Sequence, residues 1–224
     1  MKPVLQVRDL TKVYKLGAIE TPALRGVSLE VYPGEFTALA GPSGSGKSTL
    51  LHLMGGLDKP SSGEVWLDGV RIDGFCKAKL AQLRLWNLGF VFQAYNLIPV
   101  LTALENAAFV LELRGEAKKT REEKALDALE ALGMKEFAHR RPNQLSGGQQ
   151  QRVAVARALA AQPKIILADE PTANLDSKTG LALIEHLRTL NRELGITFLL
   201  STHDPRLLER VDRIVRLEDG QIAA

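Results

Sequence analysis

Cysteine is almost absent from this sequence, because Cys76 is the single one among 224 residues. An internal disulfide and a metal site of several cysteines are therefore excluded, which suits a reducing compartment. No stretch approaches the roughly 18 consecutive apolar residues of a membrane-spanning helix, and the first residues form no apolar secretory core. We therefore predict a cytoplasmic protein with no export signal of its own and no direct membrane insertion.

A large excess of one sign of charge is also lacking, because 29 basic and 26 acidic residues leave a net charge of +3. Without a sequence-wide basic footprint, we expect no nucleic-acid partner. Aromatic residues make up only 5%, but 45% hydrophobic and 25% charged residues are ordinary for a globular chain and exclude disorder, collagen and coiled coil. The length fits one large domain, or one with an inserted lobe, whose core needs no disulfide or metal.

Strand and helix patterns alternate along much of the chain. The strand patterns cover residues 4–7, 27–31, 36–40, 164–168, 196–200 and 213–217. The helical patterns cover residues 47–54, 79–86, 102–113, 120–132 and 178–194, and a further helix opens after Leu145. This alternation predicts a mostly parallel sheet, and Asp219-Gly220 predicts a hairpin turn. We interpret about 95–145 as an inserted helical lobe.

A glycine-rich loop carries the strongest chemical signal. Gly41–Ser48 matches the pattern G-x4-GK[ST] and stands after an apolar strand and before a helix. Its glycines let backbone N–H groups turn toward an anion, and the helix start adds its positive dipole end. Lys47 can then reach the outer phosphates, and Ser48 can ligate Mg2+. The loop predicts a phosphate site without identifying the nucleotide.

Two further segments point to the same chemistry. The apolar run ending at Asp169-Glu170 predicts a buried strand whose tip places Asp169 toward a cation and Glu170 toward an attacking water. Leu145–Gln149 opens a helix with Ser146 as its N-cap. The glycines after that cap expose N–H groups at a helix start, which predicts a second anion site. Two phosphate sites in one short chain suggest a shared ligand.

The Leu-Ser-Gly-Gly-Gln segment, combined with the phosphate loop, resembles the nucleotide-binding subunit of an ABC transporter over essentially the whole chain. The resemblance implies an α/β P-loop NTPase cassette, with a mixed RecA-like sheet core, an N-terminal antiparallel β subdomain and an inserted α-helical subdomain. It implies one domain over residues 1–224, with the catalytic core and β subdomain in 1–94 and 146–224 and the helical subdomain in about 95–145.

The same resemblance assigns roles to individual residues, with ATP and Mg2+ as cofactors. It implies catalytic roles for Glu170, His203 and Lys47, and Mg2+ contacts from Ser48, Gln93 and Asp169. Nucleotide contacts are implied for Tyr14, Gly41, Pro42, Ser43, Gly44, Ser45, Gly46, Lys47, Ser48, Thr49 and Gln93. Contacts to the nucleotide of a second subunit are implied for Ser146, Gly147, Gly148 and Gln149.

Four of these roles depend on the resemblance alone. Tyr14 resembles the aromatic that stacks on adenine, and Gln93 the glutamine that touches Mg2+ and links to the membrane partner. His203 resembles the histidine that contacts the γ-phosphate. Ala173–Asp176 stands where the family often has Ser-Ala-Leu-Asp, so the retained Asp176 keeps its implied role as a dimer contact. The presence of Glu170 implies that the site hydrolyses ATP. Three remaining histidines, His52, His139 and His186, match nothing in the family, and we expect them to be structural or exposed.

Finer features resemble the lipoprotein-release and macrolide-export (LolD/MacB-like) branch, namely Gln93–Pro99, Leu101–Asn106 and Pro142–Gln144. The end of the chain just after Ile222 leads us to expect no C-terminal regulatory domain. The implied partners are a second copy, in a head-to-tail homodimer formed on ATP binding, and membrane permease subunits beneath which the dimer lies at the inner face of the membrane. Two alternatives stay open: a non-transport membrane complex of the cell-division type, and a DNA- or ribosome-associated ATPase.

Overall fold

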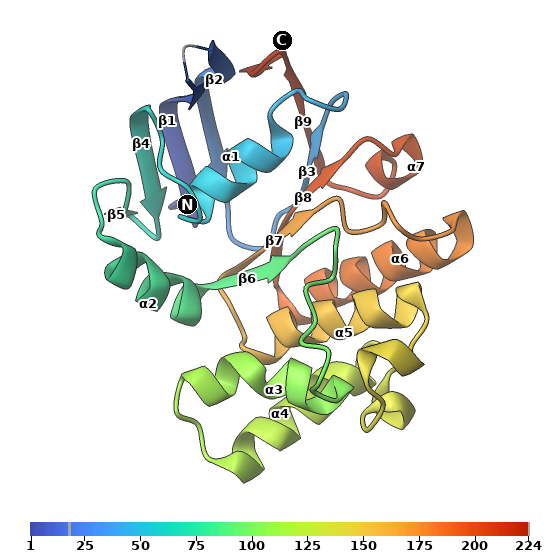
Figure 1. The fold of residues 1–224 in the computed structure, drawn as a ribbon. Helices are drawn as coiled ribbons and strands as arrows, with labels where there is room; N and C mark the ends of the chain where they lie inside the picture. The colour runs from blue at the N-terminus through green and yellow to red at the C-terminus, as the bar shows by residue number, and fades with distance from the viewer. Residues whose placement is uncertain (18, 224) are drawn as a thin grey trace.

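Two β-sheets form the framework of the chain (Figure 1), for which the computed structural model describes residues 1–17 and 19–223. The first sheet is antiparallel, in the order β2-β1-β4-β5. Its strands are β1 (Leu5–Leu16), β2 (Ile19–Val31), β4 (Ser62–Leu67) and β5 (Val70–Arg71). The second has the order β10-β9-β3-β8-β7-β6 and is parallel except for its β9-β10 hairpin. Its strands are β3 (Phe36–Ala40), β6 (Leu88–Val91), β7 (Ile165–Asp169), β8 (Thr197–Thr202), β9 (Arg213–Glu218) and β10 (Gln221–Ile222).

Helices cover both faces of the second sheet, because its buried strands are apolar on both sides. On β8, Leu199 faces a core shared with α1 and the first sheet, whereas Phe198 and Leu200 face a core built with α3, α4, α5 and α6. The helices are α1 (Lys47–Met54), α2 (Lys77–Asn87), α3 (Ala103–Leu113), α4 (Lys118–Glu130), α5 (Gly147–Ala160), α6 (Ser177–Leu194) and α7 (Pro205–Leu208), with 3-10 turns at Lys135–Phe137 and Pro142–Gln144. No helix in the described part of the chain has both the length and the apolar character that a membrane crossing needs.

The predicted fold class is confirmed, and α1 has the predicted bounds. Strands β1 and β2 are much longer than predicted, because both continue beyond their apolar segments into exposed polar ones. Strands β4, β5 and β6 were not predicted. Gly63 and Glu64 interrupt the apolar pattern of β4, and β6 follows directly after α2. The predicted turn at Asp219-Gly220 does connect β9 to β10.

The end of the second sheet closes onto the phosphate loop. Strand β3, which leads into the loop, pairs on one side with β8 and on the other with β9. The backbone N–H of Gly220 donates to Ser45 O at 3.1 Å, and Gly220 O accepts from the N–H of Arg25 at 2.8 Å. The last hairpin therefore links the phosphate loop to β2 through Gly220.

Candidate nucleotide site

The phosphate loop connects β3 to α1, and Gly46, with a φ of 102°, caps the helix start. Lys47 is only 5% exposed. Its Nζ donates to the carbonyls of Gly41 at 2.8 Å and Pro42 at 2.9 Å, and it lies 3.8 Å from Glu170 Oε1. The ammonium is thus held among the loop backbone and one carboxylate, where burial strengthens its field.

Asp169 ends β7 as the acceptor of two serine hydroxyls. Its Oδ1 accepts from Ser48 Oγ at 2.8 Å and from Ser201 Oγ at 2.6 Å. On the other side, His52 Nε2 lies 3.9 Å from Oδ2. Ser48 Oγ and Asp169 Oδ1 are the oxygen donors that Mg2+ prefers, and their separation lets one ion with ligand distances of about 2.0–2.1 Å reach both.

Glu170, the next residue, has a φ of 46°, which lies in the left-handed region that residues other than glycine rarely adopt. Its N–H donates to Ser201 Oγ at 2.8 Å. Its carboxylate is 14% exposed and lies 3.0 Å from His203 Nδ1, whose side chain is 64% exposed. Ser201 therefore supports Asp169 and Glu170 at once, and His203 reaches from solvent to the second of them.

Lys47, Ser48, Glu170 and His203 border one cleft of about 550 Å³. It is lined by Ala23, Pro42, Ser43, Gly44, Gly46, Lys47, Ser48, Thr49, Gln93, Glu170 and His203. The structure thus brings together most of the phosphate loop with three residues predicted from distant parts of the sequence. Gln93 is also tied to the loop before Asp176, because Asn174 Nδ2 donates to Gln93 O at 2.9 Å.

Tyr14 is not among the residues that line this cleft. The residue lies on β1 and is 43% exposed, and its hydroxyl donates to Asp58 Oδ2 at 3.2 Å. The ammonium of Lys12 lies 4.8 Å from the ring centroid. One face of the ring therefore carries a cation, and stacking on adenine stays a prediction.

The predicted second anion site lies at the start of α5, and its residues are not among those lining the cleft. Ser146 Oγ accepts from the N–H of Gln149 at 3.3 Å, and Gln149 Oε1 accepts from the N–H of Ser146 at 2.8 Å, so the predicted cap is a full capping box. Helix α6 packs closely here, since a β-carbon on Gly148 would lie 2.5 Å from Thr179 Cγ2.

Asp176 caps α6. Hydrogen bonds from the Thr179 side chain and from the N–H groups of Thr179 and Lys178 hold the pKa of its carboxyl below the ordinary value. The signature segment and Asp176 thus lie close together, away from the chain's own cleft.

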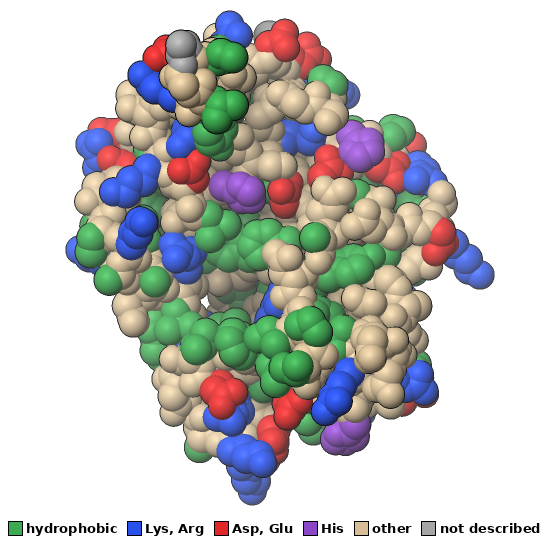
Figure 2. Space-filling model, in the orientation of Figure 1, with side chains coloured by type: hydrophobic (Ala, Val, Ile, Leu, Met, Phe, Trp, Pro, Cys, Tyr) green, Lys and Arg blue, Asp and Glu red, His purple; other side chains and the backbone are tan. Residues whose placement is uncertain are grey.

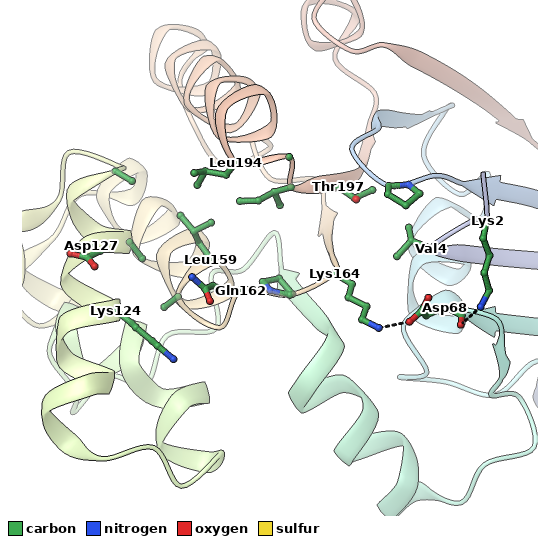
Figure 3. A pocket seen from close by; sticks show the side chains of 17 residues that line it. Lys2, Val4, Asp68, Lys124, Asp127, Leu159, Gln162, Lys164, Leu194 and Thr197 are labelled. Carbon is green, nitrogen blue, oxygen red and sulfur yellow. Dashed lines mark hydrogen bonds and ion pairs between the residues drawn. The ribbon is translucent and has the colours of Figure 1, made fainter.

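A second cleft, of about 640 Å³, opens at the opposite edge of the parallel sheet, where β7 and β8 begin (Figure 3). Lys164 pairs with Asp68 on one side, and Lys124 and Asp127 of α4 lie on the other. None of the residues predicted from the motifs lines it.

Two residues at the site were missed from the sequence. Ser201 lies in a buried strand that carries no motif, and only the pairing of β7 with β8, which sets Asp169 opposite Ser201, reveals its role. His52, expected to be structural or exposed, lies one helical turn after Ser48 and faces the same carboxylate. The i, i+4 spacing on the predicted helix could have indicated that placement.

Known proteins share the sequence pattern and the fold of this chain. The family model "ABC transporter" matches residues 24–173. The lipoprotein-releasing system ATP-binding protein LolD of Anaeromyxobacter dehalogenans is 49% identical over 223 residues, covering 99% of this chain and 93% of that protein. The macrolide export ATP-binding/permease protein MacB of Syntrophobacter fumaroxidans is 45% identical over 221 residues, covering 98% of this chain and 31% of that longer protein.

Among solved structures, the dimeric post-hydrolysis state of the ATP-binding cassette MJ0796, bound to ADP and Pi, has a TM-score of 0.91 at 45% identity. The match covers 98% of this chain and 97% of that one.

Proposed function

The chain belongs to the ABC transporter family as an ATP-binding ATPase subunit similar to LolD and MacB, and on that basis we propose how its residues carry out the reaction. One observation carries the proposal: Lys47, the Ser48–Asp169 pair and the Glu170–His203 pair converge on one cleft. These are the parts that phosphoryl transfer to water requires, namely a phosphate cradle, a cation holder and a group that positions water.

Each side chain has a distinct task in this reaction. The loop N–H groups and Lys47 offset the negative charge on the β- and γ-phosphates. Glu170, fixed by its backbone bond to Ser201, orients a water or takes its proton. His203, hydrogen-bonded to Glu170, stabilises the γ-phosphate from the solvent side.

Ser48 and Asp169 would hold Mg2+, with Gln93 from the facing loop. In the described residues, no group of three or more His, Cys, Asp or Glu side chains could hold a metal ion by itself. Mg2+ is commonly bound through one or two carboxylates plus substrate phosphates, which fits a site completed by the nucleotide. When bound, the ion would neutralise charge that develops on the phosphates.

We infer that a second copy completes the site. Ser146–Gln149 presents N–H groups at a helix start but does not line the chain's own cleft. In a head-to-tail dimer this signature segment would meet the γ-phosphate held by the other copy, with Asp176 at the contact and Tyr14 stacked on the base. The cassette MJ0796 was solved as a dimer, which supports this arrangement. We retain about 95–145 as the helical subdomain in this proposal.

This chain has a surface that suits a permease partner. Hydrophobic side chains gather around a hollow between β6 and α3 (Figure 2), and a groove of about 350 Å³ there is lined by residues of α2, β6, α3 and α5 that include Phe90, Phe109 and Leu113. Its relative MacB joins ATP-binding and permease parts in one protein. We propose that the permease docks here, which would place the dimer at the inner face of the membrane.

Mixing two inactive variants tests the shared site. Lys47→Ala removes the ammonium group that contacts the phosphates, and Ser146→Arg blocks the signature segment. Each homodimer has two defective sites, whereas a mixed dimer has one intact site and one doubly defective site. We expect mixing to restore ATPase activity, or ATP-dependent heterodimer formation if hydrolysis needs both sites. Absence of a heterodimer at every mixing ratio, while wild-type chains dimerise, contradicts the head-to-tail arrangement.

A second test concerns Glu170. Glu170→Gln should keep ATP binding, lose hydrolysis by orders of magnitude and accumulate as an ATP-bound dimer in size-exclusion chromatography. The matched control is Glu193→Gln, which makes the same change on an exposed part of α6. Wild-type turnover in Glu170→Gln would remove Glu170 from its assigned role.

A further inference from the structure

A β-bulge in the first sheet lies beside the nucleotide cleft. The register of β1 and β2 shifts between Lys12 and Val13, which leaves Ala23 of β2 without a partner in β1. Ala23 lines the cleft. Because a bulge adds its extra residue to one strand only, Lys12 and Tyr14, two residues apart on β1, stay on the same face of the sheet. Both side chains therefore stand next to the wall of the cleft.

Asp58, in the loop after α1, contacts both of these side chains. Its Oδ2 lies 2.7 Å from Lys12 Nζ and accepts from the hydroxyl of Tyr14 at 3.2 Å. Lys12 also donates to Lys59 O at 2.7 Å, and its ammonium lies 4.8 Å from the centroid of the Tyr14 ring. The ring is therefore held at its edge by a carboxylate and on one face by a cation. Only the opposite face is left for a base to stack on.

The ion pair that holds the ring is more sheltered than most surface pairs. The side chain of Lys12 is only 12% exposed, and that of Asp58 is 36% exposed. Removal from water strengthens both the ion pair and the attraction between the ammonium and the ring. Asp58 is itself fixed, because its Oδ1 accepts from the N–H of Lys59 at 2.7 Å. These contacts restrict a tyrosine ring that exposure alone would leave free to change rotamer.

We propose that Lys12 and Asp58 are positioning residues that hold the Tyr14 ring in the orientation that stacks on the base of the nucleotide. The proposal rests on the proposed function, which gives Tyr14 that stacking role. Immobilising a side chain on binding costs free energy, and a ring that is held before the nucleotide arrives avoids this cost. The base then meets a defined face of the ring, the one opposite Lys12. Positioning of this kind raises nucleotide affinity and leaves the hydrolysis step unchanged.

Calorimetric titration of the full chain with two probes, MgADP and magnesium pyrophosphate, tests this role. Pyrophosphate offers two phosphates to the phosphate loop but has no base. Asp58→Asn and Lys12→Met should each raise the Kd for ADP about three- to tenfold, which corresponds to immobilising one side chain. The Kd for pyrophosphate should stay within about twofold of the wild-type value. In steady-state ATPase assays, the same variants should raise KM and keep kcat within about twofold.

Further variants separate positioning from stability. Lys15→Met is the matched control, because Lys15 lies on the same strand and forms an exposed ion pair with Glu20. It should leave both Kd values within about twofold of wild type. In a Tyr14→Ala background, Asp58→Asn should raise the Kd for ADP no further, because Asp58 acts through the ring. If Lys12→Met does not fold, Tyr14→Phe replaces it: this variant loses only the bond to Asp58 and should raise the Kd for ADP about threefold.

Three results overturn the proposal: an unchanged Kd for ADP in folded Asp58→Asn, an equal loss of affinity for ADP and pyrophosphate, or a further loss when Asp58→Asn is added to Tyr14→Ala. The last two would show that the contacts only stabilise the hairpin. Tyr14→Ala on its own separates stacking from positioning. If it leaves the Kd for ADP unchanged, the stacking role in the proposed function is refuted. If it raises that Kd about tenfold or more and Asp58→Asn does not raise it, only the positioning role is refuted.

Discussion

Replacing Ser201 with alanine should lower both the free energy of unfolding and the rate of ATP hydrolysis. The hydroxyl of this buried residue donates to Asp169 Oδ1 at 2.6 Å and accepts from the N–H of Glu170 at 2.8 Å. A hydrogen bond to a charged group contributes about 1.5–3 kcal/mol, and leaving a buried N–H unpaired costs about 1–3 kcal/mol. Because such terms are not additive, we expect Ser201→Ala to lose about 3 kcal/mol of unfolding free energy.

The catalytic effect follows from the backbone of Glu170. Its left-handed conformation costs about 1–3 kcal/mol and is held in place by the bond to Ser201. Without that bond, Glu170 can relax away from the geometry that positions water. If about 1.4 kcal/mol of this cost is released, kcat falls about tenfold.

Urea unfolding measures the loss of stability, and steady-state ATPase assays, run well below the midpoint of unfolding, measure the loss of kcat. The control is Thr202→Val, because Thr202 is the next buried residue on β8 and its hydroxyl accepts from the N–H of Asp204 rather than contacting a site carboxylate. It should lose about 1 kcal/mol of stability and keep kcat. A Ser201→Ala protein with wild-type kcat and a stability loss below about 0.5 kcal/mol would refute the reasoning.

Two further predictions concern other parts of the chain. Gly148→Ala should lose about 1–3 kcal/mol of stability, because its β-carbon would lie 2.5 Å from Thr179 Cγ2, and adding Thr179→Ser should recover most of the loss in thermal unfolding; no recovery would place the strain elsewhere. The hydrogen bond from Arg188 holds the pKa of Asp212 below its ordinary value, so the stabilisation is fully present above about pH 4 and is lost as the pH falls through the lowered pKa. The stability difference between wild type and Asp212→Asn should therefore shrink on acidification below pH 4, and a difference that grows there would contradict the assignment.

Local chemistry explains what the sequence could predict. Helix α1 was predicted at its observed bounds because glycines flank an apolar helical pattern, and Ser146 was predicted as a cap because its side chain bonds within one turn. Ser201 was missed because its role depends on the strand register that sets it opposite Asp169. The contacts of Lys12 and Tyr14 with Asp58 depend on the loop after α1, for which no periodic pattern exists.

The order of strands in the second sheet has a consequence for protein synthesis. All five residues of β3 are buried, yet its partners β8 and β9 are made only at residues 197–202 and 213–218. While the ribosome adds the intervening chain, β3 has no partner and offers chaperones an apolar segment. The turn at Gly220 closes onto Ser45 later still. Products of interrupted translation would therefore carry the whole phosphate-loop motif without a finished nucleotide cleft. Such truncated chains would not hydrolyse ATP in the cell.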